Sequence, residues 1–116
     1  MKLKHILPIL LFVCAVQGAG AAEAVADTLR VYLVGDSTCA TKKLDKQNPE
    51  RGWGHMFQPL FDEAVVVENH ATNGRSTKSF RAEGRWARVC DRLRPGDYVF
   101  IQFGHNDQKI NDSTRY

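Results

Sequence analysis

The most informative segment of the chain reads Leu29-Arg30-Val31-Tyr32-Leu33-Val34-Gly35-Asp36-Ser37-Thr38. Its first part is an apolar run, which predicts a buried strand over Thr28–Val34. The Gly-Asp-Ser-Thr sequence that follows favours a tight turn. Open α/β sheets bind ligands at the carboxyl ends of their strands, where such a turn would present Ser37 as a nucleophile. The segment therefore indicates an α/β fold and makes Ser37 the first candidate for a catalytic side chain.

Two further strands are expected along the chain. One covers Val65–Glu68, and the other covers Tyr98–Phe103 after the turn signal Arg94-Pro95-Gly96-Asp97. Helices are expected between the strands, around Trp53–Phe61 and over Arg85–Leu93, where apolar residues recur at helical spacing. Apolar strands that alternate with helices imply a parallel sheet covered on both faces. We therefore predict an α/β fold without a second domain.

A polar turn that contains glycine follows each expected strand. The first turn carries Ser37, the second reads Asn73-Gly74-Arg75-Ser76, and the third reads Gly104-His105-Asn106-Asp107. The carboxyl ends of parallel strands lie at the same edge of a sheet, which is where ligands bind in such folds. We therefore expect one site built from three loops.

Acyl transfer explains what the second and third turns would supply. A serine that attacks an ester carbonyl creates an oxyanion, and the loss of one hydrogen-bond donor to it typically costs ~10²–10³ in rate. Gly74 has no side chain to obstruct its N–H group, and the side-chain amide of Asn106 can point to the same oxygen. The backbone N–H of Ser37 is the third candidate donor. These residues predict an oxyanion hole made of Ser37, Gly74 and Asn106.

The same residues resemble the first three signature blocks of the GDSL or SGNH hydrolases, in that family's order and spacing. The blocks are Gly35-Asp36-Ser37-Thr38, then Asn69 with Gly74-Arg75-Ser76 and Phe80, then Gly104-His105-Asn106-Asp107. Within the superfamily the chain is similar to the rhamnogalacturonan acetylesterase branch. That similarity rests on Gly52-Trp53-Gly54, Gly84, Trp86, Pro95-Gly96-Asp97-Tyr98-Val99 and Gln102-Phe103, together with the three blocks.

The resemblance implies a flavodoxin-like three-layer parallel sheet and a secreted esterase that removes acetyl groups from a pectic polysaccharide. It makes Ser37 the nucleophile, and Gly74 and Asn106 the oxyanion donors. The supporting residues that it implies are Asp36, Asn69, His105 and Asp107. No cofactor or metal ion is expected, and the expected partner is the acetylated polysaccharide substrate.

One departure from the family pattern concerns the acid and base. The family takes both from an Asp-x-x-His block near its carboxyl terminus, and no such block occurs up to Tyr116. Serine is a weak nucleophile without a base, and His105 belongs to the oxyanion block rather than to that role. We therefore interpret residues 23–116 as the N-terminal portion of a single SGNH hydrolase domain whose C-terminal part is missing, from a protein of roughly 200 residues.

The three expected strands would form the partial sheet 2-1-3 of a flavodoxin-like order. This order leaves the apolar third strand as an open edge, which invites aggregation. We expect the fragment to be poorly soluble or partly unfolded when it is expressed alone.

Residues 1–22 are interpreted as a signal peptide. Lys2, Lys4 and His5 precede the apolar run Ile6–Val16, and small residues follow over Gly18–Ala22. The apolar run is shorter than the ~20 residues that a membrane-spanning helix needs, so we expect export to the periplasm or the exterior. Cleavage after Ala22 would lower the formal net charge from +3 to +1. No argument for nucleic acid or an anionic membrane as partner remains.

Several features leave alternatives open. Cys39 and Cys90 would either form a disulfide or remain two small buried thiols. Arginines at helical spacing favour a solvated face over a site for uronate carboxylates, and core packing is favoured over sugar stacking for Trp53 and Trp86. The alternative functions are a secreted GDSL lipase or thioesterase, and an inactive glycan-binding remnant. The oligomeric state is not predicted. The four arginines at helical spacing, mentioned above as a solvated face, are Arg81, Arg85, Arg88 and Arg92.

Overall fold

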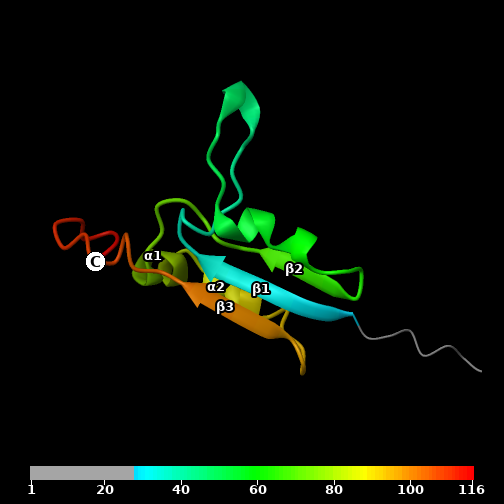
Figure 1. Cartoon of the computed structure of the whole chain (residues 1–116). Coiled ribbons are helices and arrows are strands. Elements are labelled where there is room, and N and C mark those ends of the chain that lie inside the picture. Colours follow the sequence, from blue (N-terminus) through cyan, green and yellow to red (C-terminus); the bar gives the residue numbers. More distant parts are fainter. Residues whose placement is uncertain (1–27) are drawn as a thin grey trace, which may run out of the picture.

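A computed structural model describes residues 28–116 of the chain (Figure 1). These residues form a parallel three-stranded sheet in the order β2-β1-β3. The strands are β1 (Leu29–Gly35), β2 (Val65–Asn69) and β3 (Tyr98–Gln102). Each lies within one residue of its predicted bounds, and the predicted order 2-1-3 is confirmed. The predicted signal peptide lies outside the described residues.

Strand β1 forms the centre of the core. Its residues from Val31 onward are buried, and the side chains alternate between the two faces of the sheet. Tyr32 and Val34 pack on one face with Phe80 and Val89, which come from the helices described next. Val31, Leu33 and Cys39 form a second cluster. The continuous apolar run of β1 is therefore explained by burial on both faces.

Two short helices cover the first of these faces. Helix α2 (Arg85–Cys90) ends three residues before the predicted helix does. Helix α1 (Thr77–Ala82) was not predicted, and it begins with a capping box in which Ser76 and Ser79 bond each other's backbone N–H. The common capping pattern has glutamate or glutamine at the position that Ser79 occupies, so the sequence does not match it.

Three 3₁₀ turns lie between β1 and β2: η1 (Asp45–Gln47), η2 (Trp53–Met56) and η3 (Gln58–Leu60). The single helix predicted around Trp53–Phe61 is wrong in this respect, because the segment forms η2 and η3. Pro59 lies within η3 and has no N–H group with which to continue a helical ladder. Before η2 the segment 41–52 extends away from the sheet as a long loop with η1 at its tip (Figure 1).

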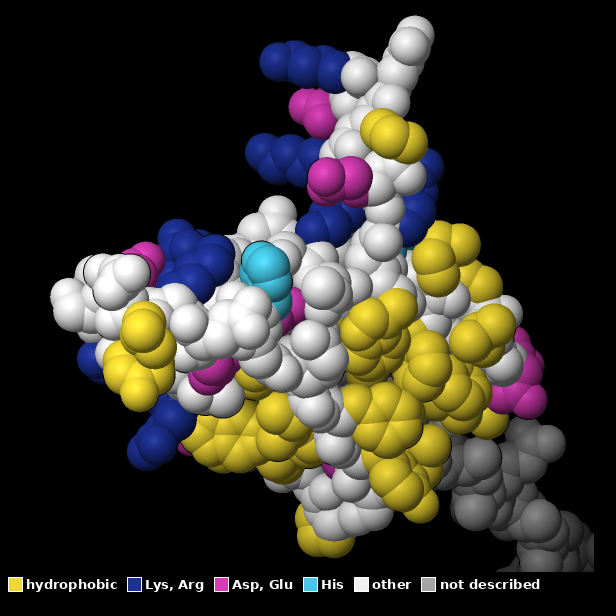
Figure 2. Space-filling view, turned by 60° about the vertical axis from the view of Figure 1, so that its left-hand side comes forward, with side chains coloured by type: hydrophobic (Ala, Val, Ile, Leu, Met, Phe, Trp, Pro, Cys, Tyr) yellow, Lys and Arg dark blue, Asp and Glu magenta, His cyan; other side chains and the backbone are white. Residues whose placement is uncertain are grey.

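Strand β3 lies at the edge of the sheet and remains largely uncovered. Phe100 and Ile101 are 43% and 62% exposed, and Tyr98 is exposed as well. The prediction of a sheet covered on both faces is therefore confirmed for β1 but wrong for β3, where the ring of Phe57 covers only part of Phe100, edge to face at 5.7 Å, and Tyr98 and Ile101 stay exposed. The open edge expected at the third strand is present. Figure 2 shows apolar side chains gathered on one side of the molecule. Poor solubility of the isolated chain stays a prediction.

No helix among residues 28–116 is both long enough and apolar enough to span a membrane. The same residues contain no group of three or more His, Cys, Asp or Glu side chains that could hold a metal ion.

Candidate functional site

The turn after β1 presents Ser37 at the carboxyl edge of the sheet. The N–H groups of Cys39 and Ala40 donate to the carbonyl of Asp36, at 3.2 and 3.0 Å, and close the turn. Asp36 is fully buried, and its Oδ1 accepts hydrogen bonds from the backbone N–H and the hydroxyl of Thr38, at 3.0 and 2.7 Å. Ser37 itself is half-buried, and its hydroxyl has no hydrogen-bond partner among the described residues. The turn is thus held by hydrogen bonds from neighbouring residues, and none of them uses the Ser37 hydroxyl.

Asn69 ties the end of β2 to this turn. Its Nδ2 donates to the carbonyl of Cys39 at 3.0 Å, and its Oδ1 accepts from the N–H of Ala71 at 3.0 Å. Both ends of the Asn69 amide are therefore used in bridging the first loop and the second.

A close approach between backbones supports the same turn from the other side. The N–H groups of Trp53 and Gly54 donate to the carbonyls of Thr38 and Cys39, at 2.9 and 3.1 Å. A Cβ atom on Gly52 would lie 2.1 Å from the carbonyl oxygen of Ala40. Any larger residue at position 52 must displace the backbone that follows Ser37.

Replacement of Gly52 with alanine is therefore expected to destabilise the fold. Strain of this kind typically costs about 1–3 kcal/mol, and more where backbone atoms collide. Thermal unfolding of the full protein measures this as a lower midpoint. Ala87→Ser, which adds one atom at an exposed position of α2, serves as the control and is expected to change stability by less than about 0.5 kcal/mol. Equal unfolding midpoints for Gly52→Ala and the wild type would contradict the close approach of Gly52 to the Ala40 carbonyl.

The second and third loops are joined through Asn106. This side chain is 1% exposed, and its Nδ2 donates to the carbonyl of Arg75 at 3.1 Å. Gly74 directly precedes Arg75 and has a φ of 73°, a left-handed conformation that glycine adopts without strain. The structure thus brings the loop of Gly74 and the amide of Asn106 together, with one amide hydrogen of Asn106 left over for another acceptor.

Asp107 anchors the third loop on helix α1. Its Oδ1 accepts from the backbone N–H of Thr77 at 3.0 Å and also from the Thr77 hydroxyl. A carboxylate at the first turn of a helix is favoured by the N–H groups exposed there. Asp107 is therefore placed to support the loop of Asn106.

The first and third loops also meet. The N–H of Asp36 donates to the carbonyl of Gln102 at 3.3 Å, and the hydroxyl of Thr38 lies 2.6 Å from Gln102 Oε1. The N–H of Thr72 donates to the carbonyl of Gly35 at 2.9 Å, which joins the first and second loops. The three loops accordingly form one connected edge.

No described histidine hydrogen-bonds to Ser37. His105 is exposed. His70 lies 3.3 Å from a carboxylate oxygen of Glu68 and stacks on Tyr32, with ring centroids 5.8 Å apart. The structure therefore supplies no partner that would take the proton of the Ser37 hydroxyl within residues 28–116.

The two described cysteines are both free, Cys39 buried and Cys90 exposed. The alternative of a disulfide is not realised, and the alternative of two buried thiols is wrong for Cys90. Burial raises the pKa of Cys39 from 9.0 to about 11, and the charge of Asp36 adds to this, while a hydrogen bond with the Gly54 backbone lowers it. A protonated, buried thiol is a poor nucleophile.

Alkylation with iodoacetamide at pH 8 is expected to modify Cys90 and to spare Cys39 while the protein is folded. Peptide mass spectrometry measures the two sites separately, and labelling in urea, which modifies both, is the control. Because folding raises the pKa of Cys39, the folded chain holds this proton more tightly. The protonated Cys39 thiol therefore adds to the free energy of unfolding. This contribution is fully present below pH 9 and is lost as the pH rises toward 11. Equal labelling of both cysteines in the folded protein would contradict the assignment.

The remaining side chains singled out in the sequence are mostly used in packing or ion pairs. Trp86 packs against the Phe80 cluster, whereas Trp53 is 37% exposed and contacts Phe57 edge to face. Hydrogen bonds from Arg85 and Arg75 lower the pKa of Glu83. Arg88 donates to the Glu83 carbonyl, Arg92 pairs with Glu68 at 2.7 Å, and Arg81 is exposed.

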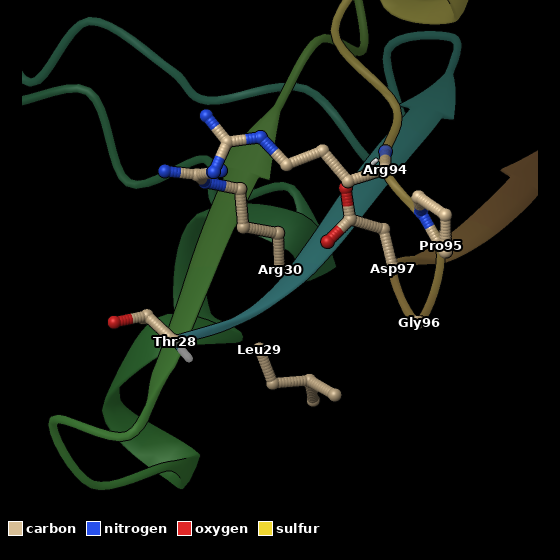
Figure 3. A pocket seen from close by; sticks show the side chains of 7 residues that line it. All are labelled: Thr28, Leu29, Arg30, Arg94, Pro95, Gly96 and Asp97. Atoms are coloured by element: carbon tan, nitrogen blue, oxygen red, sulfur yellow. Dashed lines mark hydrogen bonds between the residues drawn. The ribbon is translucent and has the colours of Figure 1, made fainter. Parts of the chain in front are cut away.

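A separate hollow lies at the opposite, amino-terminal edge of the sheet. It is lined by Thr28, Leu29 and Arg30 with the turn Arg94–Asp97 (Figure 3). The N–H of Arg94 donates to Asp97 Oδ2 at 2.8 Å, and the N–H of Asp97 donates to the Arg94 carbonyl at 3.1 Å. The predicted turn at 94–97 is thus confirmed, and the hollow beside it is distinct from the site around Ser37.

The fold and the site together define a parallel α/β protein with a serine presented at the carboxyl edge of its sheet. The chain belongs to the GDSL-like Lipase/Acylhydrolase family, whose sequence profile matches residues 33–116. The family predicted from the motifs and its flavodoxin-like α/β fold class are confirmed.

Three curated proteins illustrate the similarity. The chain is 46% identical over 88 residues to the rhamnogalacturonan acetylesterase RhgT of Bacillus subtilis, covering 76% of this chain and 38% of that protein. It is 42% identical over 87 residues to a rhamnogalacturonan acetylesterase of Emericella nidulans, covering 73% and 32%. It is 42% identical over 86 residues to the probable rhamnogalacturonan acetylesterase YesY of B. subtilis, covering 74% and 39%. The chain therefore spans about two fifths or less of the length of these relatives.

Proposed function

We propose that this chain supplies the nucleophile and the oxyanion hole of a carbohydrate acetylesterase that acts on an acetylated pectic polysaccharide. The observation that carries the proposal is the meeting of three loops at one sheet edge, with the free hydroxyl of Ser37 in the first, Gly74 in the second and the buried amide of Asn106 in the third. The substrate class rests on the similarity to proteins named as rhamnogalacturonan acetylesterases.

In the proposed reaction Ser37 Oγ bonds to the acetyl carbonyl carbon while the hydroxyl proton passes to a base. The carbonyl oxygen becomes an oxyanion that accepts hydrogen bonds from the N–H groups of Ser37 and Gly74 and from Asn106 Nδ2. Breakage of the ester bond then releases the sugar hydroxyl, which takes up a proton, and leaves an acetyl-serine that water hydrolyses to acetate. Residues 28–116 are assigned no base, because none of their histidines contacts Ser37.

The supporting roles follow from the contacts around these three residues. Asp36 and Asn69 keep the first turn in shape, and Asp107 holds the third loop against α1. His105 lies beside Asn106 on the exposed side of the same loop. We also propose that the protein is exported, on the pattern of charged, apolar and small residues in 1–22.

The acyl group that is released tests the proposal. The full protein is expected to release acetate from acetylated rhamnogalacturonan and to act poorly on p-nitrophenyl esters of longer acids. The reverse preference would favour a thioesterase or a lipase, the second of which the family description names. Binding of the polysaccharide without release of acetate, unchanged by Ser37→Ala, would favour an inactive glycan-binding protein.

A further inference from the structure

Two lysines outside the motif blocks hold the residues of the proposed oxyanion hole. Lys42 Nζ donates to the backbone carbonyl of Ser37 at 2.5 Å and to Asn73 Oδ1 at 2.9 Å. Lys109 Nζ donates to Asn106 Oδ1 at 3.0 Å. The first lysine therefore bridges the loops of Ser37 and Gly74, and the second binds the side chain of Asn106.

The contact of Lys109 fixes the orientation of the Asn106 amide. A side-chain amide has one end that accepts and one that donates, and an ammonium group can only donate. With Oδ1 held by Lys109, Nδ2 must form the donor end, which is the end that bonds the Arg75 carbonyl at 3.1 Å. A charged donor on the amide oxygen also polarises the group, so that its N–H hydrogens become stronger donors.

The contacts of Lys42 position the other two proposed oxyanion donors, the backbone N–H groups of Ser37 and Gly74. Asn73 directly precedes Gly74, and its carbonyl accepts a hydrogen bond from Arg75 Nη1 at 3.0 Å. The residues on both sides of Gly74 are thus held, the first through Lys42 and the second through Asn106. Because Lys42 also bonds the carbonyl of Ser37, it sets the distance between the loops that carry the two backbone donors.

Neither lysine forms a close ion pair with a carboxylate, although the charge of Lys109 contributes to lowering the pKa of Asp112. Among residues 28–116 no Asp or Glu oxygen lies within 4.0 Å of Lys42 Nζ or Lys109 Nζ. The carboxylates of the two loops, the buried Asp36 and the half-buried Asp107, instead bond the threonines Thr38 and Thr77. Two positive charges therefore remain beside the donors, where negative charge would develop on the oxyanion.

We propose that Lys42 and Lys109 are positioning residues that orient the oxyanion donors and keep positive charge beside them. This inference rests on the proposed function. It predicts that loss of either ammonium lowers kcat more than it changes KM, because the interaction with the oxyanion exists only in the transition state.

The test compares Lys42→Met and Lys109→Met with the wild type of the full protein, with p-nitrophenyl acetate as substrate. A neutral ester excludes any effect on the attraction of uronate carboxylates. Each variant is expected to lower kcat by about 10- to 100-fold, less than the ~10²–10³ for a lost donor, with KM within about threefold. Lys43→Met is the matched control, because Lys43 is exposed and its ammonium has no partner among the described residues. Its kcat is expected to equal that of the wild type.

A readout independent of turnover separates this inference from the proposed function. In ¹⁵N–¹H spectra, Lys42→Met is expected to shift the Gly74 amide signal, and Lys109→Met the side-chain NH₂ signals of Asn106, while Lys43→Met shifts neither. Where a methionine variant does not fold, Lys42→Gln or Lys109→Gln replaces it. Glutamine keeps a hydrogen-bond donor but removes the charge, so a smaller loss of kcat is expected. Normal kcat in these variants of an active protein would overturn the inference, as would unshifted signals. An inactive wild type with the expected shifts would overturn the proposed function and leave the contacts supported.

Discussion

Replacement of Ser37 with alanine is expected to lower the kcat of acetyl ester hydrolysis by about 10⁴- to 10⁶-fold. Ser37 Oγ is the atom proposed to bond the acetyl group, and the hydroxyl of the adjacent Thr38 is bonded to Asp36 Oδ1 instead. The closest thiol, Cys39, is buried, and its pKa is raised to about 11. Initial rates on p-nitrophenyl acetate and on acetylated rhamnogalacturonan measure the loss.

The same substitution is expected to leave the fold intact. The Ser37 hydroxyl has no hydrogen-bond partner among the described residues, so its removal leaves no buried group unpaired. The midpoint of thermal unfolding should therefore be unchanged. Ser113→Ala, which removes an exposed hydroxyl elsewhere, is the matched control and should keep full activity. Activity in Ser37→Ala within tenfold of the wild type would exclude Ser37 as the nucleophile.

Asn106→Ala is expected to show the second largest loss, about 10²- to 10³-fold in kcat with little change in KM. The amide is proposed to bond the oxyanion, which is absent from the bound ester. The substitution also leaves the Arg75 carbonyl and Lys109 Nζ without their partner, which typically costs about 1–3 kcal/mol of stability. Thermal unfolding measured beside the kinetics separates the two effects.

Asn111→Ala is the control for Asn106→Ala, because Asn111 is exposed and its side chain has no hydrogen bond within the described part of the chain. It should resemble the wild type in both measurements. A rise in KM with an unchanged kcat for Asn106→Ala would instead make Asn106 a residue that binds the ester in its ground state.

The strands were predictable because they depend on local patterns, and their order was predictable because the family resemblance implies a flavodoxin-like sheet. An apolar run such as Val31–Val34 is needed wherever a strand is buried on both faces, and parallel pairing places the loops that follow at one edge. The placement of Ser37, Gly74 and Asn106 on adjoining loops follows from that topology alone.

The features that were missed depend on contacts between distant segments or on unusual residue choices. Helix α1 has only six residues and relies on the Ser76–Ser79 capping box. Pro59 interrupts a segment whose apolar residues otherwise suggested one helix.

Lys42 and Lys109 were missed for a related reason. A lysine in a polar loop is usually solvated, and the sequence gives no sign that its side chain folds back on a nearby carbonyl. Only the three-dimensional arrangement shows that Lys42 reaches both Ser37 and Asn73.

The most direct test of the account is the site of covalent modification when the full protein is treated with a fluorophosphonate, which mimics an ester under attack. Peptide mass spectrometry locates the adduct. We expect a single phosphonylated residue, Ser37, formed in the folded protein, absent after denaturation in urea and formed more slowly in Asn106→Ala. A protein that releases acetate while its adduct lies on another residue, or while Ser37 stays unmodified, would contradict the account.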